Sequence, residues 1–340
     1  MSTNVIDVVI GIDGGATKTE CSLLQVSSRT QLGSALTGSS NKNSVGNDCA
    51  KRNLTDGMIG AVRDAYEKLS DPTVQFQLIG LCFGMSGVDR PHDKALVRSW
   101  VPDMTRELVQ SVVVDERSVI TVADDLNVQI YNDAIAALSS GTMGHLKDAL
   151  VIISGTGMIV TGSSDGENFV RTGGWGPLLG DEGSGYSIGS EVLKACVNSE
   201  DKLLNEDTVL VDLVKKHLQI ETMSQLIDFA YKDTAWSRIA DLAKLAFDGY
   251  ALNDNVSRRI VSNAAASLEK YIRAAANNLG WSRDKQFTLV YTGSVLTHDN
   301  SVVAKALSEN LKQSFPSITI TLPKVSAAIG SALLVTQPKE

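Results

Sequence analysis

Cysteine and histidine are scarce in this sequence, and neither is arranged for metal binding or cross-linking. Among 340 residues there are only four of each type. The cysteines are scattered without a C-x-x-C pair, at Cys21, Cys49, Cys82 and Cys196. The histidines lie apart from any partner at a catalytic or metal-ligand spacing, at His92, His145, His217 and His298. The pattern predicts no disulfide framework and no zinc site, and it indicates a reducing compartment.

Long apolar runs and blocks of positive charge are missing as well. Lys and Arg number 31 against 39 Asp and Glu, so the net charge is 31 − 39 = −8. This balance argues against nucleic acid or an anionic membrane as a partner. No stretch approaches the roughly 18 apolar residues of a spanning helix, and the first residues lack the pattern of a secretory leader. We therefore expect a cytoplasmic protein of about two domains.

The sequence VVIGIDGGATKTECSLLQV (residues 8–26) begins as a buried strand and stops at Asp13, Gly14 and Gly15. Its glycine spacing matches neither the dinucleotide fingerprint nor the P-loop. The following residues alternate in character, which predicts a second strand and therefore a hairpin with a glycine turn. Glycine permits positive φ and close approach of an oxyanion, and Thr17 and Lys18 add donors. The alternative is that the glycines serve the turn alone.

A second segment, ALVIISGTGMIVTG (residues 149–162), repeats this strand–turn–strand pattern. Gly155, Thr156 and Gly157 take the place of the first turn. Two such hairpins, each at the head of half the chain, suggest two related α/β domains that face a common ligand. Coincidence is the alternative, because the similarity is short.

Further elements are predicted from periodicity and turn residues. Strands are expected near residues 31–36, 75–83, 112–114, 119–122, 128–131 and 286–292. Helices are expected over residues 48–69, from Pro91, over 134–141, across much of 189–280, and from Ser326.

Five motifs now stand in order: IDGGATKT, NDA, ISGTG, YTGSVL and SAAIGSALL. In this order the chain resembles the superfamily of sugar kinases, actin and heat-shock chaperones over nearly its whole length. Within it, NKNSVG and GGWGPLLGDEGSGY resemble the eukaryotic N-acetylglucosamine kinases and the related 2-hydroxyacyl-CoA dehydratase activators. The resemblance implies an α/β fold: two ribonuclease-H-like (actin-like ATPase) domains, with a cleft between them that closes over ATP and sugar. We expect domains at 1–143 and 144–325, the latter with a helical insertion, and a closing helix at 326–340 that packs back on the first domain.

The resemblance also implies a reaction and its residues. The γ-phosphoryl group of ATP would pass to the 6-hydroxyl of N-acetylglucosamine, with Mg²⁺ held by Asp13, most simply through water. The β- and γ-phosphates would contact Gly14, Gly15, Thr17 and Lys18. Gly155, Thr156 and Gly157 would form a second phosphate-binding turn. Gly293, Ser294 and Val295 would line the adenosine pocket. The sugar would contact Asn41, Ser86, Gly87, Asp133, Gly174 and Asp181. Trp175 would form a wall of the sugar pocket, the alternative being ordinary core packing.

Three carboxylate sites compete for the role of general base. Asp133 ends a strand within NDA, where the resemblance places the base, and it begins a helix whose amides stabilise the ionised form. Its alternative role is a helix N-cap. Asp124 and Asp125 are adjacent on an extended chain and point apart, which favours a solvated turn. Asp181 and Glu182 lie in a glycine-rich loop, and Asp181 suits the binding of sugar hydroxyls. We therefore predict Asp133 as the base.

Other functions remain open at this point. The chain could be an ATP-driven activator of a dehydratase, although Cys82 and Cys196 lie far apart and outside the expected glycine–cysteine setting. It could be a sugar sensor without catalysis. As a kinase it could act on glucosamine, N-acetylmannosamine or N-acetylmuramic acid, since its GVDRP loop (residues 87–91) differs from that of some relatives. Relatives commonly dimerise, so a homodimer is expected.

Overall fold

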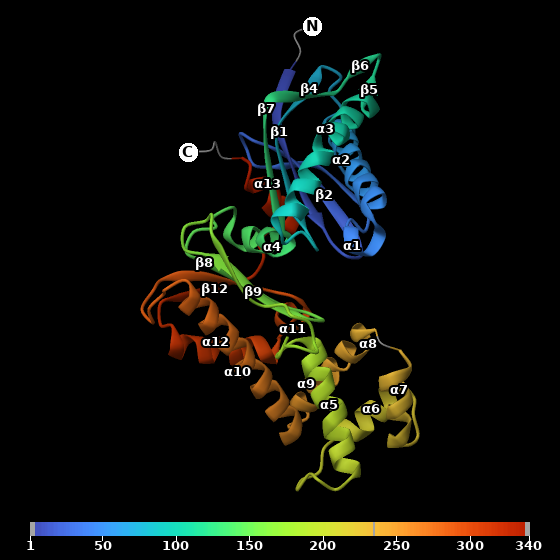
Figure 1. Cartoon of the computed structure of the whole chain (residues 1–340), viewed down its shortest axis with the longest axis vertical. Helices are drawn as coiled ribbons and strands as arrows, with labels where there is room; N and C mark the ends of the chain where they lie inside the picture. Colours follow the sequence, from blue (N-terminus) through green and yellow to red (C-terminus); the bar gives the residue numbers. More distant parts are fainter. Residues whose placement is uncertain (1–3, 234, 337–340) are drawn as a thin grey trace. The chain divides into compact units, whose positions relative to one another are not determined.

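The computed structural model describes residues 4–233 and 235–336 of the chain, and it divides them between two compact units (Figure 1). The first unit runs to Leu146 and resumes at Pro323, and the second runs from Lys147 to Leu322. The domain limits predicted from the sequence, residues 143 and 325, each lie three residues from the observed limits, residues 146 and 322. No helix in the described ranges combines the length and apolar character needed to cross a membrane.

The first unit is built on a five-stranded mixed sheet in the order β3-β2-β1-β4-β7. Strands β1, β2 and β3 form an antiparallel meander, whereas β4 and β7 run parallel to β1. The elements of this unit are β1 (Asn4–Gly14), β2 (Lys18–Gln25), β3 (Gln31–Gly38), α1 (Lys42–Val45), α2 (Asn47–Leu69), β4 (Val74–Met85), α3 (Pro91–Ser111), β5 (Val113–Val114), β6 (Arg117–Ser118), β7 (Ile120–Asn132), α4 (Asp133–Thr142) and α13 (Ala327–Leu333).

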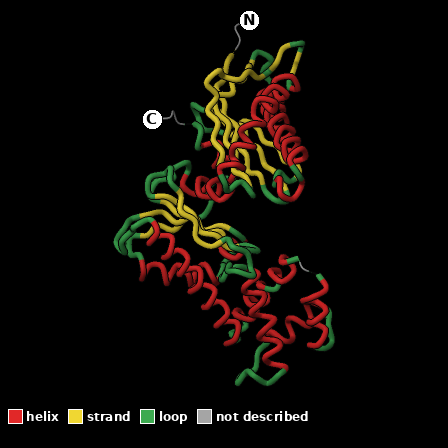
Figure 2. Tube along the Cα trace, in the orientation of Figure 1, coloured by secondary structure: helices red, strands yellow, loops and turns green. Residues whose placement is uncertain are grey.

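Helices cover both faces of this sheet (Figure 2). On one face, α2 turns Leu54, Met58 and Val62 inward at helical spacing, and all three are fully buried with residues of α3 and the sheet. On the other face lies α13, whose Ala332 packs against Val9 of β1 and neighbouring residues. The contact is so close that a Cβ on Gly11 would lie 2.1 Å from the Ala328 carbonyl oxygen, which explains the glycine in mid-strand.

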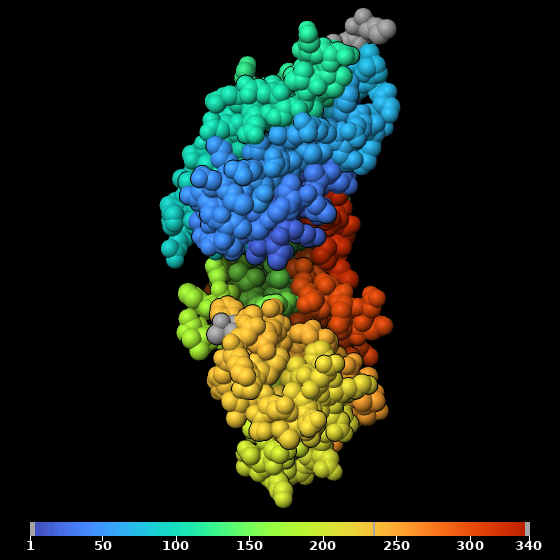
Figure 3. Space-filling view, turned by 90° about the vertical axis from the view of Figure 1, so that its right-hand side faces the viewer, coloured from blue at the N-terminus to red at the C-terminus, as the bar shows by residue number. Residues whose placement is uncertain are grey.

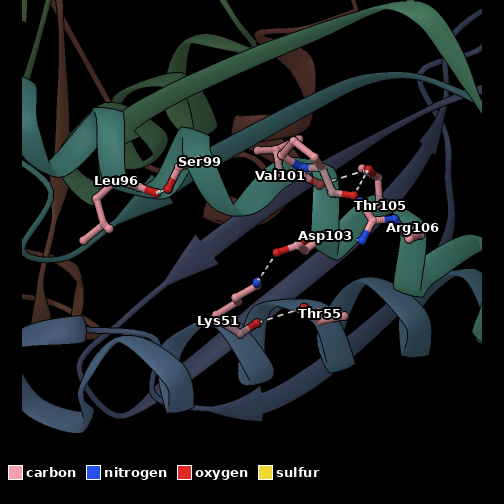
Figure 4. Close-up of polar contacts among 9 residues, drawn as sticks. Lys51, Thr55, Leu96, Ser99, Val101, Asp103, Thr105 and Arg106 are labelled. Carbon is pink, nitrogen blue, oxygen red and sulfur yellow. Dashed lines mark hydrogen bonds and ion pairs between the residues drawn. The ribbon is translucent and has the colours of Figure 1, made fainter.

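Helix α3 is fixed against α2 by an ion pair as well as by apolar packing. The ammonium of Lys51 lies 2.8 Å from a carboxylate oxygen of Asp103, as Figure 4 shows. In the same view, the Thr55 hydroxyl donates to the Lys51 carbonyl and the Thr105 hydroxyl donates to the Val101 carbonyl. The two helices form one layer over the sheet that is held mainly by their shared buried side chains, and the exposed ion pair adds little to it.

The second unit repeats the strand arrangement of the first: its sheet has the order β10-β9-β8-β11-β12, with the same sequence of antiparallel and parallel pairs. This duplication confirms the predicted α/β fold. The elements are β8 (Ala149–Ser154), β9 (Met158–Ser163), β10 (Phe169–Gly173), α5 (Gly185–Glu200), α6 (Leu210–Leu218), the 3₁₀ helix η1 (Met223–Gln225), α7 (Leu226–Lys232), α8 (Trp236–Asp241), α9 (Ala243–Ala251), α10 (Asn255–Asn278), β11 (Phe287–Thr292), α11 (Ser294–Thr297), α12 (Val302–Ser314) and β12 (Ile318–Thr321).

Most of the second unit's core is helical. Its largest apolar cluster joins Leu150 and Leu289 of the sheet to residues of α5, α10 and α12, such as Val192 and Leu268. The helical segment that follows α5, coloured yellow in Figure 3, forms one continuous surface of this unit. The predicted helical region between residues 189 and 280 is observed as several helices, from α5 to α10.

Two local predictions were wrong. The segments near 119–122 and 128–131 are one strand, β7, and Asp124 and Asp125 lie within it rather than in a turn. Both are exposed, where the pairing register between β4 and β7 shifts and leaves extra residues on β7. The extra residues of this bulge interrupt the alternation of polar and apolar side chains along β7. The sequence pattern therefore indicated two separate segments instead of one strand.

Candidate active site

Three parallel strands of the first unit end side by side, and each delivers a predicted site residue there. Gly14 of β1 pairs with Met85 of β4, which pairs with Asn132 of β7. Asp13, Ser86 and Asp133 therefore meet at the carboxyl edge of the sheet, which is where ligands bind in sheets with parallel strands. A backbone bond from Ser86 N–H to the Gly14 carbonyl, 2.8 Å long, joins two of these chain ends directly.

Asp133 is held by a side-chain hydrogen bond and is not a helix cap. The Ser86 hydroxyl donates to Asp133 Oδ2. The cap of α4 is Asn132, whose Oδ1 accepts from the Ala134 N–H at 2.9 Å. The alternative reading of Asp133 as an N-cap was therefore wrong: the neighbouring residue performs that role and leaves the Asp133 carboxylate available to a ligand.

The electrostatics of the strand ends keep protons on the two carboxylates more tightly than usual. Burial raises the pKa of Asp13 to about 6, assisted by the charges of Asp133 and Glu20 and opposed by Lys18. Burial also raises the pKa of Asp133, with a further rise from Asp89 and opposing hydrogen bonds from Ser86 and backbone amides. Raised carboxylate pKa values in a shared site are typical of functional groups and of sites that accept a cation.

Mg²⁺ is the cation implied by the resemblance, and the donor set fits it. Mg²⁺ takes one or two carboxylates and keeps several water molecules, so a dedicated cage is unnecessary. Asp13 and Asp133 supply two carboxylates of like charge at the ends of β1 and β7, the strands on either side of β4. Within the described ranges, no group of three or more His, Cys, Asp or Glu side chains forms a metal cage. The arrangement suits a metal that arrives with a polyphosphate better than one bound by protein alone.

The remaining first-unit residues predicted for sugar and phosphate gather around the same edge. A Cβ on Gly87, which has a φ of +77°, would lie 2.9 Å from Asn41 Oδ1, so the two positions are adjacent. A Cβ on Gly14 would lie 2.4 Å from the Ser40 hydroxyl. Thr17 and Lys18 are exposed in the turn and at the start of β2.

Of the two reasons expected for the glycines in the hairpin turns, positive φ was wrong. Gly14 and Gly15 do not have positive φ, and neither do Gly155 and Gly157. Close approach is the reason at Gly14, as the distance to Ser40 shows. At Gly155 an added Cβ would meet no described atom within 4 Å, so the bare backbone there faces open space.

The second hairpin is braced by the start of α5. The Gly155 N–H donates to the Gly157 carbonyl across the turn. The Gly155 and Thr156 carbonyls accept from the N–H groups of Gly185 (2.7 Å) and Tyr186 (3.2 Å). These bonds tie the turn to the first residues of a helix and fix the turn's shape.

Asp181 lies against this hairpin and is short of a partner. Its Oδ2 is 2.7 Å from the position of a Cβ on Gly157, and its side chain is buried. Its Oδ1 has no hydrogen-bond donor among the described residues. An unsatisfied buried carboxylate oxygen is costly, and a ligand hydroxyl would satisfy it. Glu182, by contrast, is exposed and accepts a hydrogen bond from the Tyr271 hydroxyl.

Gly174 and Trp175 lie in the loop between β10 and α5. Gly174 has a φ of +71°, and its carbonyl accepts from Arg171. Trp175 is 72% exposed, which excludes core packing as its role. An exposed tryptophan in a glycine-rich loop is suited to ligand contact.

A cavity of about 340 Å³ in the second unit brings together four of the six residues predicted there for the nucleotide, and Gly157 and Gly293 are not part of its lining. Gly155 and Thr156 line it with Ser294 and Val295, although more than 130 residues separate the two pairs in sequence. Sequence reasoning missed the rest of the lining: Gly185, Ser237, Ala240, Asp241, Ala243, Lys244, Phe247 and His298. His298 is exposed, as expected, but it also packs edge-on against Phe247 with ring centroids 5.1 Å apart.

Comparison with known proteins agrees with this geometry. The sequence model of the BadF/BadG/BcrA/BcrD ATPase family matches residues 10–335. The chain is 36% identical to the N-acetyl-D-glucosamine kinase of Dictyostelium discoideum, over 98% of this chain and 99% of that protein. It is 29% identical to the N-acetylmuramic acid/N-acetylglucosamine kinase of Clostridium acetobutylicum, over 96% and 97% respectively.

Solved structures show the same fold at low sequence identity. A protein of Chromobacterium violaceum, provisionally described as an N-acetylglucosamine kinase, superposes with a TM-score of 0.64 at 19% identity, over 98% of this chain and 99% of the other. The ROK hexokinase of Thermus thermophilus superposes with a TM-score of 0.54 at 15% identity, over 96% and 97%. At this level of identity the similarity concerns architecture.

Proposed function

The chain belongs to the BadF/BadG/BcrA/BcrD ATPase family, and from this premise we propose that it is an ATP-dependent kinase acting on the 6-hydroxyl of N-acetylglucosamine. The observation that carries the proposal is the cluster at the strand ends of the first unit, where Ser86 holds the Asp133 carboxylate beside Asp13. The 36% identity to an N-acetylglucosamine kinase over nearly the full chain supports the choice of sugar.

Asp133 is the proposed general base. Phosphoryl transfer asks a protein mainly for positioning and for stabilisation of charge, and the acceptor hydroxyl needs a base within hydrogen-bond reach. The hydrogen bond from Ser86 orients the Asp133 carboxylate, and its raised pKa brings its basicity closer to the working pH. Asp133 would accept the 6-hydroxyl proton as that oxygen attacks the γ-phosphorus, the bond from this phosphorus to the β,γ-bridging oxygen breaks, and ADP leaves.

Asp13 is the proposed contact to Mg²⁺, directly or through water. When bound, Mg²⁺ would neutralise charge on the β- and γ-phosphate oxygens. Gly14 and Gly15, with Thr17 and Lys18, would contact these phosphates from the first hairpin. In the second unit, Gly155, Thr156 and Gly157 are proposed to contact phosphate as well.

The cavity of the second unit is the proposed nucleoside site. Gly293, Ser294 and Val295 would line the adenosine, and Phe247 with His298 offers aromatic surface for the base. Lys244 is a nearby cation, although Asp241 already binds it at 2.8 Å. For the sugar, the proposed contacts in the second unit are Asp181, through its unpartnered oxygen, Gly174 and Trp175. Those proposed in the first unit are Asn41 and Gly87.

The dehydratase-activator function is disfavoured by the state of the cysteines. Metal clusters bind thiolates, but Cys82 and Cys196 are buried, and burial raises the pKa of both thiols, that of Cys196 to about 12. A cytoplasmic homodimer stays a prediction from the sequence and the resemblance.

The direct test of this function is an assay of purified protein with Mg²⁺-ATP and a panel of amino sugars. We expect ADP release that depends on N-acetylglucosamine, with the phosphate located on the 6-oxygen by NMR. Omission of Mg²⁺ should abolish turnover. ATP hydrolysis that proceeds equally without sugar, or tight sugar binding with no phosphorylated product, would show that the proposal is wrong.

Substitution of Gly155 by Ala tests the proposed phosphate contact of the second hairpin turn. Because an added Cβ meets no described atom within 4 Å, the variant should fold with unchanged thermal stability. A methyl group in the space assigned to phosphate should raise the KM for ATP about tenfold or more, as overpacking of a contact does. The KM for the sugar serves as the internal control, and an unchanged KM for ATP would remove Gly155 from the nucleotide site.

A further inference from the structure

The turn that carries Asp181 lies against one side of α10. Within the second unit, this helix packs against β9, β10 and α5 (Figure 1). Ala264, Leu268 and Tyr271 follow one another along α10 at intervals of four and three residues, which places them on the same side of the helix. All three lie close to residues next to Asp181, in the segment between β10 and α5.

The chain after Asp181 is held by packing and by backbone hydrogen bonds. Gly183 has a φ of +85°, and a Cβ there would lie 2.7 Å from Leu268 Cγ. The Gly183 carbonyl accepts from the buried Ser154 hydroxyl at 2.9 Å, and Ser154 ends β8. The Asp181 carbonyl accepts from the Ser184 N–H at 3.0 Å. This side of the turn is therefore tied to both α10 and the second hairpin.

One hydroxyl group, that of Tyr271, lies against both chain neighbours of Asp181. It donates a hydrogen bond to Glu182 Oε2. The same hydroxyl oxygen would lie 3.4 Å from a Cβ on Gly180, so the residue before Asp181 also lies against it. Burial raises the pKa of Tyr271 to about 12, with further rises from the hydrogen bond to Glu182 and from its charge. The phenol therefore keeps its proton at neutral pH and stays a donor.

Asp181 combines an unusual backbone conformation with an unsatisfied side chain. Its φ is +64°, in the left-handed region that few residues other than glycine adopt. Such a conformation persists where the surrounding structure holds it in place. Asp181 is only 4% exposed, and its Oδ1 accepts no hydrogen bond from the described residues. A buried acceptor that is held in this way is suited to a ligand hydroxyl.

We propose that Tyr271 is a positioning residue of the sugar site: by holding Glu182, it fixes the turn in which Asp181 presents its unpartnered oxygen to a sugar hydroxyl. The inference rests on the proposed kinase function and adds two residues to it. Glu182 serves as the anchor of the turn, because its carboxylate is exposed and is bound by the phenol. Asp181 is the contact to the sugar, because its carboxylate is buried and lacks a donor.

The test separates sugar affinity from turnover. Tyr271→Phe keeps the ring, which packs against the apolar core of the second unit, and removes only the hydroxyl. With Mg²⁺-ATP we expect the KM for N-acetylglucosamine to rise about five- to tenfold, as the loss of one hydrogen bond predicts. The kcat and the KM for ATP should stay within about twofold, because the lost contact acts on sugar binding. Isothermal titration of the sugar without ATP should show the same rise in Kd.

A double-mutant cycle shows whether the effect passes through Glu182. Glu182→Ala, alone or together with Tyr271→Phe, should raise the KM for the sugar by the same factor as Tyr271→Phe alone, because each variant removes the same hydrogen bond. Glu182→Gln keeps an acceptor oxygen for the phenol and should retain most of the affinity. Tyr250→Phe removes the hydroxyl of another half-buried tyrosine of this unit, on α9, and should change none of these values.

The outcomes distinguish this inference from the function on which it rests. If the wild type phosphorylates N-acetylglucosamine and Tyr271→Phe has an unchanged KM and Kd for the sugar, this inference alone is overturned. Equal rises in the KM values for sugar and ATP would indicate a general structural role and overturn it too. Additive effects in the double variant would indicate that Glu182 contacts the sugar itself, with the same consequence. Absence of phosphorylation of any sugar by the wild type overturns the proposed function and this inference with it.

Discussion

Replacing Asp133 by Asn should lower kcat by about 10²- to 10⁴-fold, the usual contribution of a general base, and change the KM values for sugar and ATP only a few-fold. Asn has the same shape, and its side-chain oxygen can still accept the hydrogen bond from Ser86. The variant should therefore bind both ligands, but it has no group that can take the hydroxyl proton. Steady-state kinetics with isothermal titration of both ligands measure the two effects separately.

Asp124→Asn is the matched control for this result. Asp124 lies on the same strand, β7, and is exposed at its bulge, away from the strand end. Its substitution removes the same charge and should leave kcat unchanged. If Asp133→Asn turned over at near the wild-type rate, or if Asp124→Asn lost as much activity, the assignment of the base would be wrong.

The parts of this site that could be predicted from the sequence are those whose residues all lie within one short segment of the chain. The hairpin at Asp13 and the one at Gly155 were predicted because strand, glycine turn and strand follow one another directly in the sequence. The position of Asp133 at the end of a strand was predicted for the same reason. Its alternative role as a cap was a local ambiguity, since Asn132 and Asp133 are both good caps and only the structure shows which side chain accepts the hydrogen bond from the Ala134 N–H.

Contacts across long sequence separations could not be predicted. The cavity proposed for the nucleoside combines the second hairpin with Ser237, Lys244 and Phe247 from two helices about 80 residues further along. Nothing local marks those side chains, because ordinary helical periodicity accounts for their segment equally well. The bulge in β7 is a similar case, since its extra residues interrupt the alternation that identifies a strand.

Asp13→Asn should abolish most of the activity while making the metal-free protein more stable. Loss of the carboxylate beside the phosphates should lower kcat by about 10²-fold or more and raise the Mg²⁺ concentration required for turnover, because a fixed charge at the reacting group is lost. The stability effect has the opposite sign. Burial and neighbouring charges raise the pKa of Asp13 from 3.8 to about 6, so ionisation is more costly in the folded chain than in the unfolded one.

The pH dependence of the stability follows from the raised pKa of Asp13. Between about pH 4 and pH 6 the unfolded chain gives up the Asp13 proton first, so this residue's contribution to stability falls as pH rises and is at its lowest above pH 6. Because Asn never ionises, the gain of Asp13→Asn over the wild type should grow across that window and level off at about 1–3 kcal/mol. Urea unfolding in EDTA at pH 4.5 and pH 7.5 measures it, with Asp7→Asn, an exposed position of the same strand, as the control. If Asp13→Asn raised the free energy of unfolding by the same amount at both pH values, the pKa of Asp13 would not be raised in the folded chain. The argument for a cation at the end of β1 would then be lost.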